Sequence, residues 1–147
     1  MRPVLVTPTC RRRFDKEGKS VNTHGEYPDA IRWVAQKENV PLIELNGMTT
    51  MLCDALGVDG SMKLYVHYPA GTFPGQTREF KDNSHFSTYG AYETAKCVVE
   101  GMKKAKLDIA NYLRADYKGF NPAQPDKFET FKWNLCPFTE IEKPDGN

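Results

Sequence analysis

A carboxylate and an imidazole stand three residues apart in the segment Lys81–Gly90, at Asp82 and His85. Histidine has an unperturbed pKa near neutrality, so a positioned imidazole can take a proton from a hydroxyl nucleophile and return it to a leaving group. That role needs an acid that binds the second ring nitrogen, fixes the tautomer and stabilises the imidazolium. Because positions i and i+3 can lie on one side of a helical turn or tight loop, Asp82 and His85 are candidates for the acid and base of one catalytic site.

The same spacing also has a purely structural interpretation, in which Asp82 caps a surface turn and His85 is merely exposed or half-buried. The residues that follow favour a helix, since Ser87 is a good N-cap residue and apolar residues recur behind it at helical spacing. The sequence therefore predicts a helix over 88–104, with the Asp/His segment leading into it. Its expected apolar positions are Ala91, Tyr92, Ala95, Val98, Val99 and Met102, and its expected opposite face carries Glu93, Lys96, Glu100, Lys103 and Lys104.

The block from Asp82 to Ala91, Asp-Asn-Ser-His-Phe-Ser-Thr-Tyr-Gly-Ala, resembles the last sequence block of the SGNH (GDSL-type) esterases. The resemblance implies that Asp82 and His85 are the acid and base of a Ser-His-Asp triad. It runs from about Pro3 to about Lys106, and the tail Lys143–Asn147 is similar to the ends of bacterial members. Further stretches resemble the rhamnogalacturonan acetylesterase branch: Pro3–Pro8, Arg11–Phe14, Thr23–Pro28 and Val40–Leu45.

Two parts of the family pattern are missing from the chain. SGNH esterases carry the nucleophilic serine in a Gly-Asp-Ser block, and a glycine and a Gly-x-Asn-Asp block supply oxyanion donors. No Gly-Asp-Ser, Gly-x-Ser-x-Gly or Gly-x-Asn-Asp sequence occurs between Met1 and Asn147. The resemblance therefore implies the C-terminal portion of an esterase, starting just before the fourth strand of the family's sheet, and we expect no meaningful turnover by this chain alone.

The resemblance also implies an α/β fold, part of the three-layer α/β/α SGNH-hydrolase (flavodoxin-like) fold. Two short apolar runs flank an amphipathic segment, which predicts a right-handed βαβ unit with parallel pairing. We assign 1–113 to the C-terminal part of an esterase domain and 114–147 to an irregular tail, containing aromatic and proline residues, that packs on it. We expect parallel strands near 4–7 and 40–45 and helices near 27–38, 47–56 and 88–104.

Finer expectations concern the helices and the segment 61–81. The first helix should bury a stripe made of Tyr27, Ile31, Val34 and Ala35, with Trp33 at its side. The second should be capped by Asn46, filled by Met48 and Met51, and stopped by Gly57. The third could continue through Leu107, Ala110 and Leu113. The segment 61–81, which is rich in glycine and proline, reads as a loop.

Basic and aromatic residues are candidates for substrate binding. Arg11, Arg12 and Arg13 follow the first strand in a polar loop, at the sheet edge where open α/β sheets bind ligands. Arginine binds carboxylates bidentately, so one of them could hold a uronic acid of a polygalacturonate-type substrate. The alternatives are a solvated loop, or an arginine that pairs with a nearby acid and braces the site.

His67 and Tyr68 are also substrate-binding candidates, because the aromatic segment around them could form one wall of a sugar cleft. Equally, its aromatic residues could pin the loop onto the core. His24 and His67 have no sequence-adjacent partner, which favours structural or solvent roles for them.

Composition excludes some partners. The chain has 147 residues, 39% of them hydrophobic, and a formal net charge of +1 from 20 basic and 19 acidic residues. No global charge therefore attracts nucleic acid or an anionic membrane. No apolar run approaches the roughly 18 residues of a membrane span, and the N-terminus turns polar too quickly for a signal peptide. Localisation stays open, although the resemblance implies a secreted or periplasmic parent protein.

The four cysteines, Cys10, Cys53, Cys97 and Cys136, form no Cys-x-x-Cys pair. Neither a zinc site nor a redox dithiol is therefore indicated, and we expect no metal and no cofactor. Cys53 and Cys97 lie among apolar residues and are expected to be small core residues. Spacing alone assigns no disulfide.

Functions from different classes remain open. The first is a piece of a metal-independent carbohydrate esterase that removes acetyl groups from pectic rhamnogalacturonan, with an acetylated pectic polysaccharide or oligosaccharide as its partner. The alternatives are a non-catalytic glycan-binding or complementing half, and a gene fragment without independent function. Two strands leave an unpaired sheet edge, which a second copy or an N-terminal complement could cover.

Overall fold

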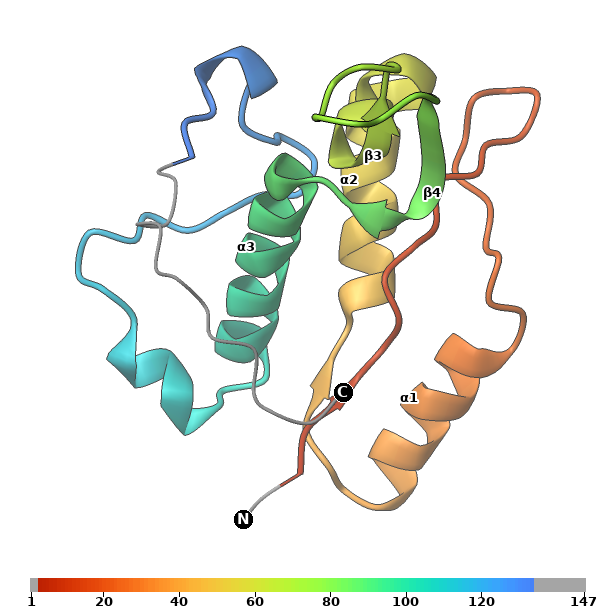
Figure 1. Ribbon diagram of the computed structural model, residues 1–147. Coiled ribbons are helices and arrows are strands. Elements are labelled where there is room, and N and C mark those ends of the chain that lie inside the picture. Colours follow the sequence, from red (N-terminus) through yellow and green to blue (C-terminus); the bar gives the residue numbers. More distant parts are fainter. Residues whose placement is uncertain (1–2, 134–147) are drawn as a thin grey trace, which may run out of the picture.

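The computed structural model of the chain describes residues 3–133. Helices and strands alternate along most of this length, as Figure 1 shows. In chain order the elements are β1 (Leu5–Val6), α1 (Tyr27–Lys37), β2 (Leu42–Ile43), α2 (Leu45–Gly60), the 3-10 helix η1 (Ser61–Leu64), β3 (Tyr65–Tyr68), β4 (Phe80–Phe86), α3 (Thr88–Lys104) and the 3-10 helices η2 (Asp108–Tyr112) and η3 (Phe128–Thr130).

β1 and β2 form a parallel pair, with Leu5 opposite Leu42 and Val6 opposite Ile43. Both strands are shorter than the expected ranges 4–7 and 40–45. Prolines at positions 3, 8 and 41 lack the N–H group that would extend the ladder, which accounts for the short pairing. α1 contacts β1 and α3 contacts β2, and the two helices lie on opposite sides of the pair in Figure 1.

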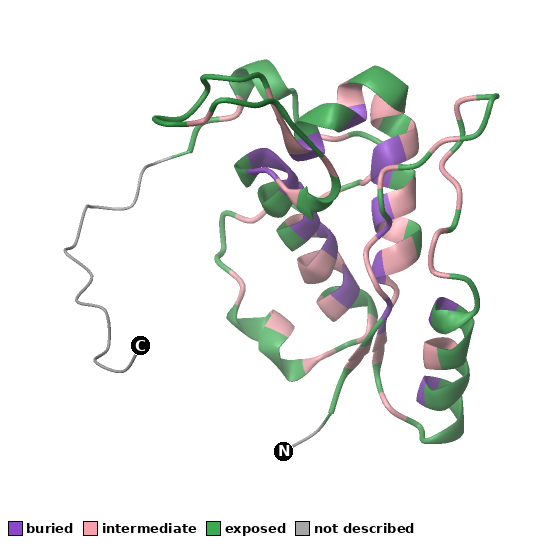
Figure 2. Cartoon of the chain, turned by 45° about the vertical axis from the view of Figure 1, so that its right-hand side comes forward, coloured by how far each residue is buried: buried purple, intermediate pink, exposed green. Residues whose placement is uncertain are grey.

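The core lies where α2, α3, η1 and β3 meet. Leu52 and Cys53 of α2 pack there with Leu64, Tyr65 and Tyr89, all buried. α3 approaches closely because it carries glycine at its contacts: a Cβ atom at Gly90 would lie 1.8 Å from the backbone oxygen of Leu64. Figure 2 shows buried positions concentrated on α2 and α3, whereas α1 is largely exposed.

The predicted apolar stripe of α1 is wrong in part. Tyr27 is 76% exposed and Val34 is also exposed, while the buried residues of the helix are Pro28 and Ala35. α1 packs mainly on the short strand β1. The strand covers only a narrow face of the helix, on which Pro28 and Ala35 lie seven positions apart.

The start of α2 differs from the prediction. The helix begins at Leu45, after Glu44, and Asn46 does not cap it. Asn46 instead ties the helix to the exit of β1, donating its backbone N–H to the Thr7 hydroxyl (2.8 Å) and its side-chain amide to the Pro8 carbonyl (3.0 Å). Gly57 breaks the helix with φ of 69°, in agreement with the expected stop. Met51 is exposed rather than part of the core.

α3 spans Thr88–Lys104, the range expected from the sequence, and the Ser87 side chain accepts the N–H of Gly90 at its start. The predicted buried face is wrong in part, since Ala91, Tyr92 and Ala95 are exposed, whereas Val98 and Met102 are half-buried and pack on the core. The buried side carries Tyr89, Gly90, Glu93, Thr94, Cys97 and Gly101.

Glu93 on the buried face of α3 is 0% exposed and forms an ion pair with Lys96 at 2.8 Å. Lys96 is therefore the countercharge of the buried carboxylate, and it also pairs with the distant Asp126 at 2.7 Å. The helix does not continue to Leu113 either, because Lys106 has φ of 52° and ends it before η2.

The segment predicted as a loop over 61–81 contains regular structure. β3 and β4 form an antiparallel pair in which Tyr65 lies opposite Phe86 and His67 opposite Lys81, with an irregularity between Tyr65 and His67. The turn between the strands holds Gly71 and Gly75 in left-handed conformation, with φ of 78° and 77°. Asp82 and His85 therefore lie within strand β4 rather than on a free loop.

Aromatic residues of 114–133 pack on the body of the fold. The ring of Tyr89 makes edge contacts with Phe128 and Phe131, with centroids 5.3 and 5.4 Å apart. Expectations about Cys136 and the rest of 134–147 lie outside the described residues. Over 3–133, no helix has both the length and the apolar character needed to cross a membrane.

Candidate active site

Asp82 and His85 touch at the end of β4. His85 Nδ1 lies 2.7 Å from Asp82 Oδ2, and the other carboxylate oxygen, Oδ1, accepts the backbone N–H groups of Ser84 (2.7 Å) and His85 (2.8 Å). The three contacts fix the carboxylate against the backbone and the ring against the carboxylate. The side-chain contact places the two residues as a hydrogen-bonded dyad.

The protonation of the dyad follows from the charge on Asp82. The backbone N–H groups of His85 and Ser84 and the imidazole lower the pKa of Asp82 from 3.8 to about 2. An ionised carboxylate can only accept hydrogen bonds, so at neutral pH the proton of this contact belongs to His85 Nδ1. Neutral His85 then presents an unprotonated Nε2, which is the atom that a general base uses.

The open face of the dyad is the imidazole of His85, whose side chain is 81% exposed, against 37% for Asp82. Within residues 3–133, no hydrogen bond to His85 Nε2 is found. The structure contains both arrangements considered from the sequence, because Asp82 caps the turn through one oxygen and binds the imidazole through the other.

Asn83, between the two members of the dyad, connects three chain segments. Its side-chain oxygen lies 2.8 Å from His67 Nε2 on β3 and accepts a longer hydrogen bond of 3.3 Å from Arg12 Nη1. Its backbone oxygen accepts the N–H of Arg12 at 2.9 Å. The sequence interpretation missed Asn83, because its partners stand 71 and 16 residues away and no local signal identifies them.

The guanidinium group of Arg12 binds other groups of this chain. Nε donates to the Ser61 hydroxyl at 3.1 Å, Nη2 to the Val58 carbonyl at 2.6 Å, and the group lies over the Phe14 ring. Of the alternatives raised for the arginines, bracing describes Arg12 better than substrate binding, although its hydrogen-bonding partners are neutral groups rather than an acid.

The other two arginines are not drawn into this cluster. Arg11 and Arg13 are exposed, and no hydrogen bond or ion pair of their guanidinium groups is found in the part of the chain that the structure describes. His24 places Nε2 2.8 Å from the Thr9 carbonyl, so it braces the loop that carries the arginines.

Tyr68 lies half-buried at the end of β3 and makes an edge contact with Phe73, with centroids 5.1 Å apart. Tyr68 and His67 line a cavity of about 350 Å³. Neither Asp82 nor His85 lines it, so these aromatic residues border a neighbouring hollow. The other lining residues are Lys63, Tyr65, Ser87, Thr88, Tyr89, Phe128 and Phe131.

The chain is similar to two curated proteins of Bacillus subtilis. Rhamnogalacturonan acetylesterase RhgT is 40% identical over 111 residues, which cover 76% of this chain and 48% of RhgT. The probable rhamnogalacturonan acetylesterase YesY is 29% identical over 111 residues, covering 76% of this chain and 46% of YesY. The chain is a relative of the rhamnogalacturonan acetylesterases. It spans about half the length of the curated relatives it matches, and no protein-family model matches it.

A solved structure supports the fold class. The crystal structure of the Bacillus subtilis protein YxiM matches with a TM-score of 0.56 and 24% sequence identity, over 71% of this chain and 26% of that protein. At that identity the likeness bears on the fold alone, which is α/β in agreement with the expected class.

Within 3–133, no group of three or more histidine, cysteine, aspartate or glutamate side chains could hold a metal ion together. The dyad itself presents an exposed imidazole that is oriented by Asp82, an arrangement that can transfer protons.

Proposed function

We propose that this chain provides the acid–base half of an SGNH-type carbohydrate esterase that removes acetyl groups from pectic rhamnogalacturonan. The observation that carries the proposal is the 2.7 Å contact between His85 Nδ1 and the ionised Asp82, in a His85 side chain that is 81% exposed. Similarity to RhgT and YesY supports the reaction class and the substrate class.

His85 acts twice in this reaction. Its Nε2 takes the proton from a serine hydroxyl as the serine oxygen attacks the acetyl carbonyl carbon, and then gives that proton to the departing sugar oxygen. In the second half, Nε2 takes a proton from the water that attacks the acetyl-enzyme and returns it to the serine oxygen as acetate leaves. Asp82 stays ionised throughout and stabilises the imidazolium.

The nucleophile and the oxyanion donors come from outside this chain in our proposal. No Gly-Asp-Ser or Gly-x-Asn-Asp block occurs in the sequence, and within residues 3–133 no serine or threonine hydroxyl is hydrogen-bonded to the His85 ring. General acid–base groups contribute roughly 10²–10⁴-fold to a rate, but they require a reacting group to act on. We therefore propose that the chain alone has no meaningful turnover.

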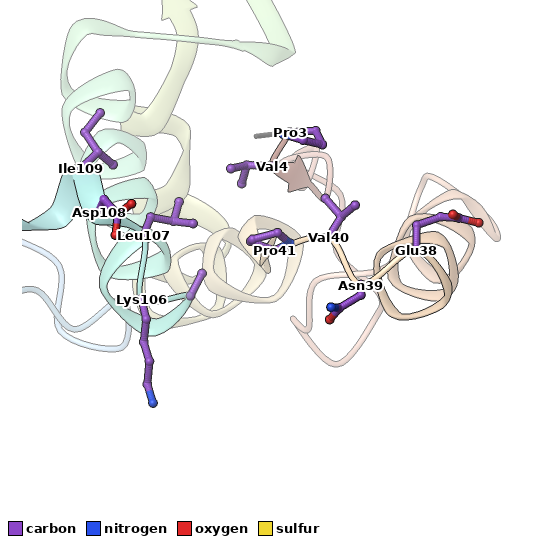
Figure 3. A pocket seen from close by; sticks show the side chains of 11 residues that line it. Pro3, Val4, Glu38, Asn39, Val40, Pro41, Lys106, Leu107, Asp108 and Ile109 are labelled. Carbon is purple, nitrogen blue, oxygen red and sulfur yellow. The ribbon is translucent and has the colours of Figure 1, made fainter. Parts of the chain in front are cut away.

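The β1–β2 side of the molecule favours a complementing role over a stand-alone glycan binder. Val6 of β1 is 42% exposed, and a cavity of about 700 Å³ opens beside the strands. Figure 3 shows apolar side chains from three segments around it, among them Val4, Pro41, Leu107 and Ile109. Strands of a parallel sheet are normally covered on both faces, so we propose that an N-terminal complement of the esterase covers this side.

The test is esterase activity of two proteins, this chain alone and a chimera that joins it to the part of RhgT that it does not match. Release of acetate from acetylated rhamnogalacturonan and hydrolysis of 4-nitrophenyl acetate are measured. We expect turnover only in the chimera, falling about 10²–10⁴-fold in His85→Ala and Asp82→Ala. Lys16→Ala, at an exposed position outside the dyad, is the matched control and should leave the rate unchanged.

Two outcomes would contradict the proposal. Turnover by the isolated chain that disappears in His85→Ala would show that the nucleophile lies within it. An active chimera that is unaffected by His85→Ala would remove the catalytic role and leave Asp82 and His85 as a capping pair.

A further inference from the structure

Two cysteines that stand far apart in the sequence meet in the core. The sulfur atoms of Cys10 and Cys53 lie 3.3 Å apart, although 43 positions separate the residues. Cys10 follows β1 in the loop that carries Arg11–Arg13, and Cys53 lies on α2. Both cysteines are free thiols in the structure, and their contact brings the loop against the helix.

The surroundings hold both thiols in place. The backbone N–H of Cys10 donates to the Thr49 hydroxyl at 2.9 Å, and its carbonyl accepts the Tyr65 hydroxyl at 2.9 Å. Cys53 sits on the buried face of α2, one turn beyond Thr49. Contacts other than the one between the sulfur atoms therefore position both residues, Cys10 through its backbone hydrogen bonds and Cys53 through its helix.

We propose that Cys10 and Cys53 are a redox pair that closes into a disulfide when the protein meets a peroxide. In the first step the Cys10 thiolate attacks one peroxide oxygen and the O–O bond breaks, giving a sulfenic acid and hydroxide. In the second step Cys53 attacks the sulfenic sulfur, the S–O bond breaks and the S–S bond forms. Hydrogen peroxide is reduced to two waters, which take up the protons of both thiols.

The two thiols differ in pKa and in exposure, as the two reaction steps require. The hydrogen bond from Cys53, which outweighs the opposing effect of burial, lowers the pKa of Cys10 to about 7. The same contact and burial raise the pKa of Cys53. Cys10 is also the more accessible of the two, at 5% exposure against 1%. Cys10 is therefore the attacking thiolate and Cys53 the resolving thiol.

The bond would act on the candidate site through Arg12. Arg12 stands two residues after Cys10 and binds both the backbone and the side chain of Asn83, beside the dyad. A disulfide to α2 restricts the loop that carries Arg12. The restricted Arg12 then stabilises the Asp82–His85 turn through its hydrogen bonds to Asn83. The sequence spacing gave no sign of a redox dithiol, because the pairing depends on the fold.

The experiment uses the full chain, reduced and then treated with hydrogen peroxide, alkylated and digested with trypsin. The four cysteines fall in four different tryptic peptides, which begin at residues 1, 38, 97 and 133. We expect the peptide of Cys10 linked to that of Cys53, two hydrogens lighter than their sum, with Cys97 recovered alkylated. The oxidised chain should also unfold at a higher temperature and be cut more slowly by trypsin after Arg11–Arg13 when folded.

Variants separate the proposal from non-specific oxidation. Cys53→Ser should abolish the linked peptide and both protective effects, and Cys97→Ala should retain them. Recovery of Cys10 and Cys53 as alkylated thiols from a folded, peroxide-treated chain would overturn the proposal. A link from Cys10 to Cys97 or Cys136 in place of Cys53 would overturn it equally.

Discussion

The β3–β4–α3 side of the molecule and the β1–β2–α1 side are built differently. On the first side, the start of α3 packs directly on the backbone of Leu64, and the Asp82–His85 turn is held by hydrogen bonds from its own backbone and from distant segments. On the second side, two strands of two residues each are paired, and Val6 and most of α1 are exposed. A hydrogen-bonded Asp–His pair can thus be assembled by local and long-range contacts while the sheet beside it is left uncovered.

The difference indicates where stability and function reside in this chain. Asn83, between the members of the dyad, is bound by His67 of β3 and by Arg12, which in turn binds Ser61 of η1 and Val58 of α2. The sheet side buries little, so changes there should matter chiefly when a complement is bound. Substitutions made separately on the β3–β4–α3 side and on the β1–β2–α1 side test this difference.

The largest effect is expected at Gly90. A Cβ atom there would lie 1.8 Å from the Leu64 carbonyl oxygen, and a backbone atom cannot move aside without displacing η1. Gly90→Ala should lower the free energy of unfolding by more than about 3 kcal/mol in urea titrations. On the sheet side, Gly101→Ala meets the Ile43 side chain at 2.4 Å, and a side chain can shift, so about 1–3 kcal/mol is expected.

Gly47→Ala is the control for both glycine variants. Its Cβ would have only a 3.7 Å contact with Glu44, and alanine favours the helix, so a change of less than about 1 kcal/mol is expected. Equal losses at positions 47 and 90 would contradict the close packing of α3 on η1.

A smaller effect is expected at Arg12. Arg12→Ala removes the hydrogen bonds to Ser61, Val58 and the Asn83 side chain, and should cost about 1–2 kcal/mol of unfolding free energy. Arg13→Ala, next in sequence but exposed, should change it by less than about 0.5 kcal/mol. If the two variants behave alike, Arg12 does not brace the dyad.

The smallest effect is a pH dependence at Asp82. Folding lowers the pKa of Asp82 from 3.8 to about 2, so the ionised form stabilises the folded chain fully above pH 3.8 and the contribution is lost as pH falls through about 2. The difference in unfolding free energy between the native chain and Asp82→Asn should therefore be constant near neutral pH and vanish towards pH 2. A difference that does not change between pH 6 and pH 2 would contradict the charged contact.

Local sequence signals predicted local structure well. The N-cap at Ser87 and helical periodicity placed α3 over 88–104, and the i, i+3 spacing placed Asp82 beside His85. Residue type alone placed Glu93 on the exposed face of α3, whereas its carboxylate is buried and paired with Lys96, which also binds the distant Asp126. The β3–β4 pair was missed because a turn rich in glycine and proline separates its strands.

In the candidate site, too, local sequence signals predicted the local contact but not the long-range ones. Asp82 and His85 were found because both lie within four residues, whereas Asn83 binds His67 and Arg12 across separations of 16 and 71 positions. The sequence indicates Arg12 as a candidate for substrate binding, with bracing of the site as one of the alternatives. Contacts of this range depend on how β3, β4 and the loop after β1 come together.

The most direct test of the central claim, that Asp82 orients His85 for proton transfer, is the ¹⁵N and ¹H NMR spectrum of the imidazole in the full chain. For the neutral imidazole of His85, we predict the proton on Nδ1, hydrogen-bonded to Asp82, and an unprotonated Nε2. In Asp82→Ala this preference should be lost, while the resonances of His24 stay unchanged. A neutral His85 with its proton on Nε2, in a folded chain at a pH where Asp82 is ionised, would contradict the account.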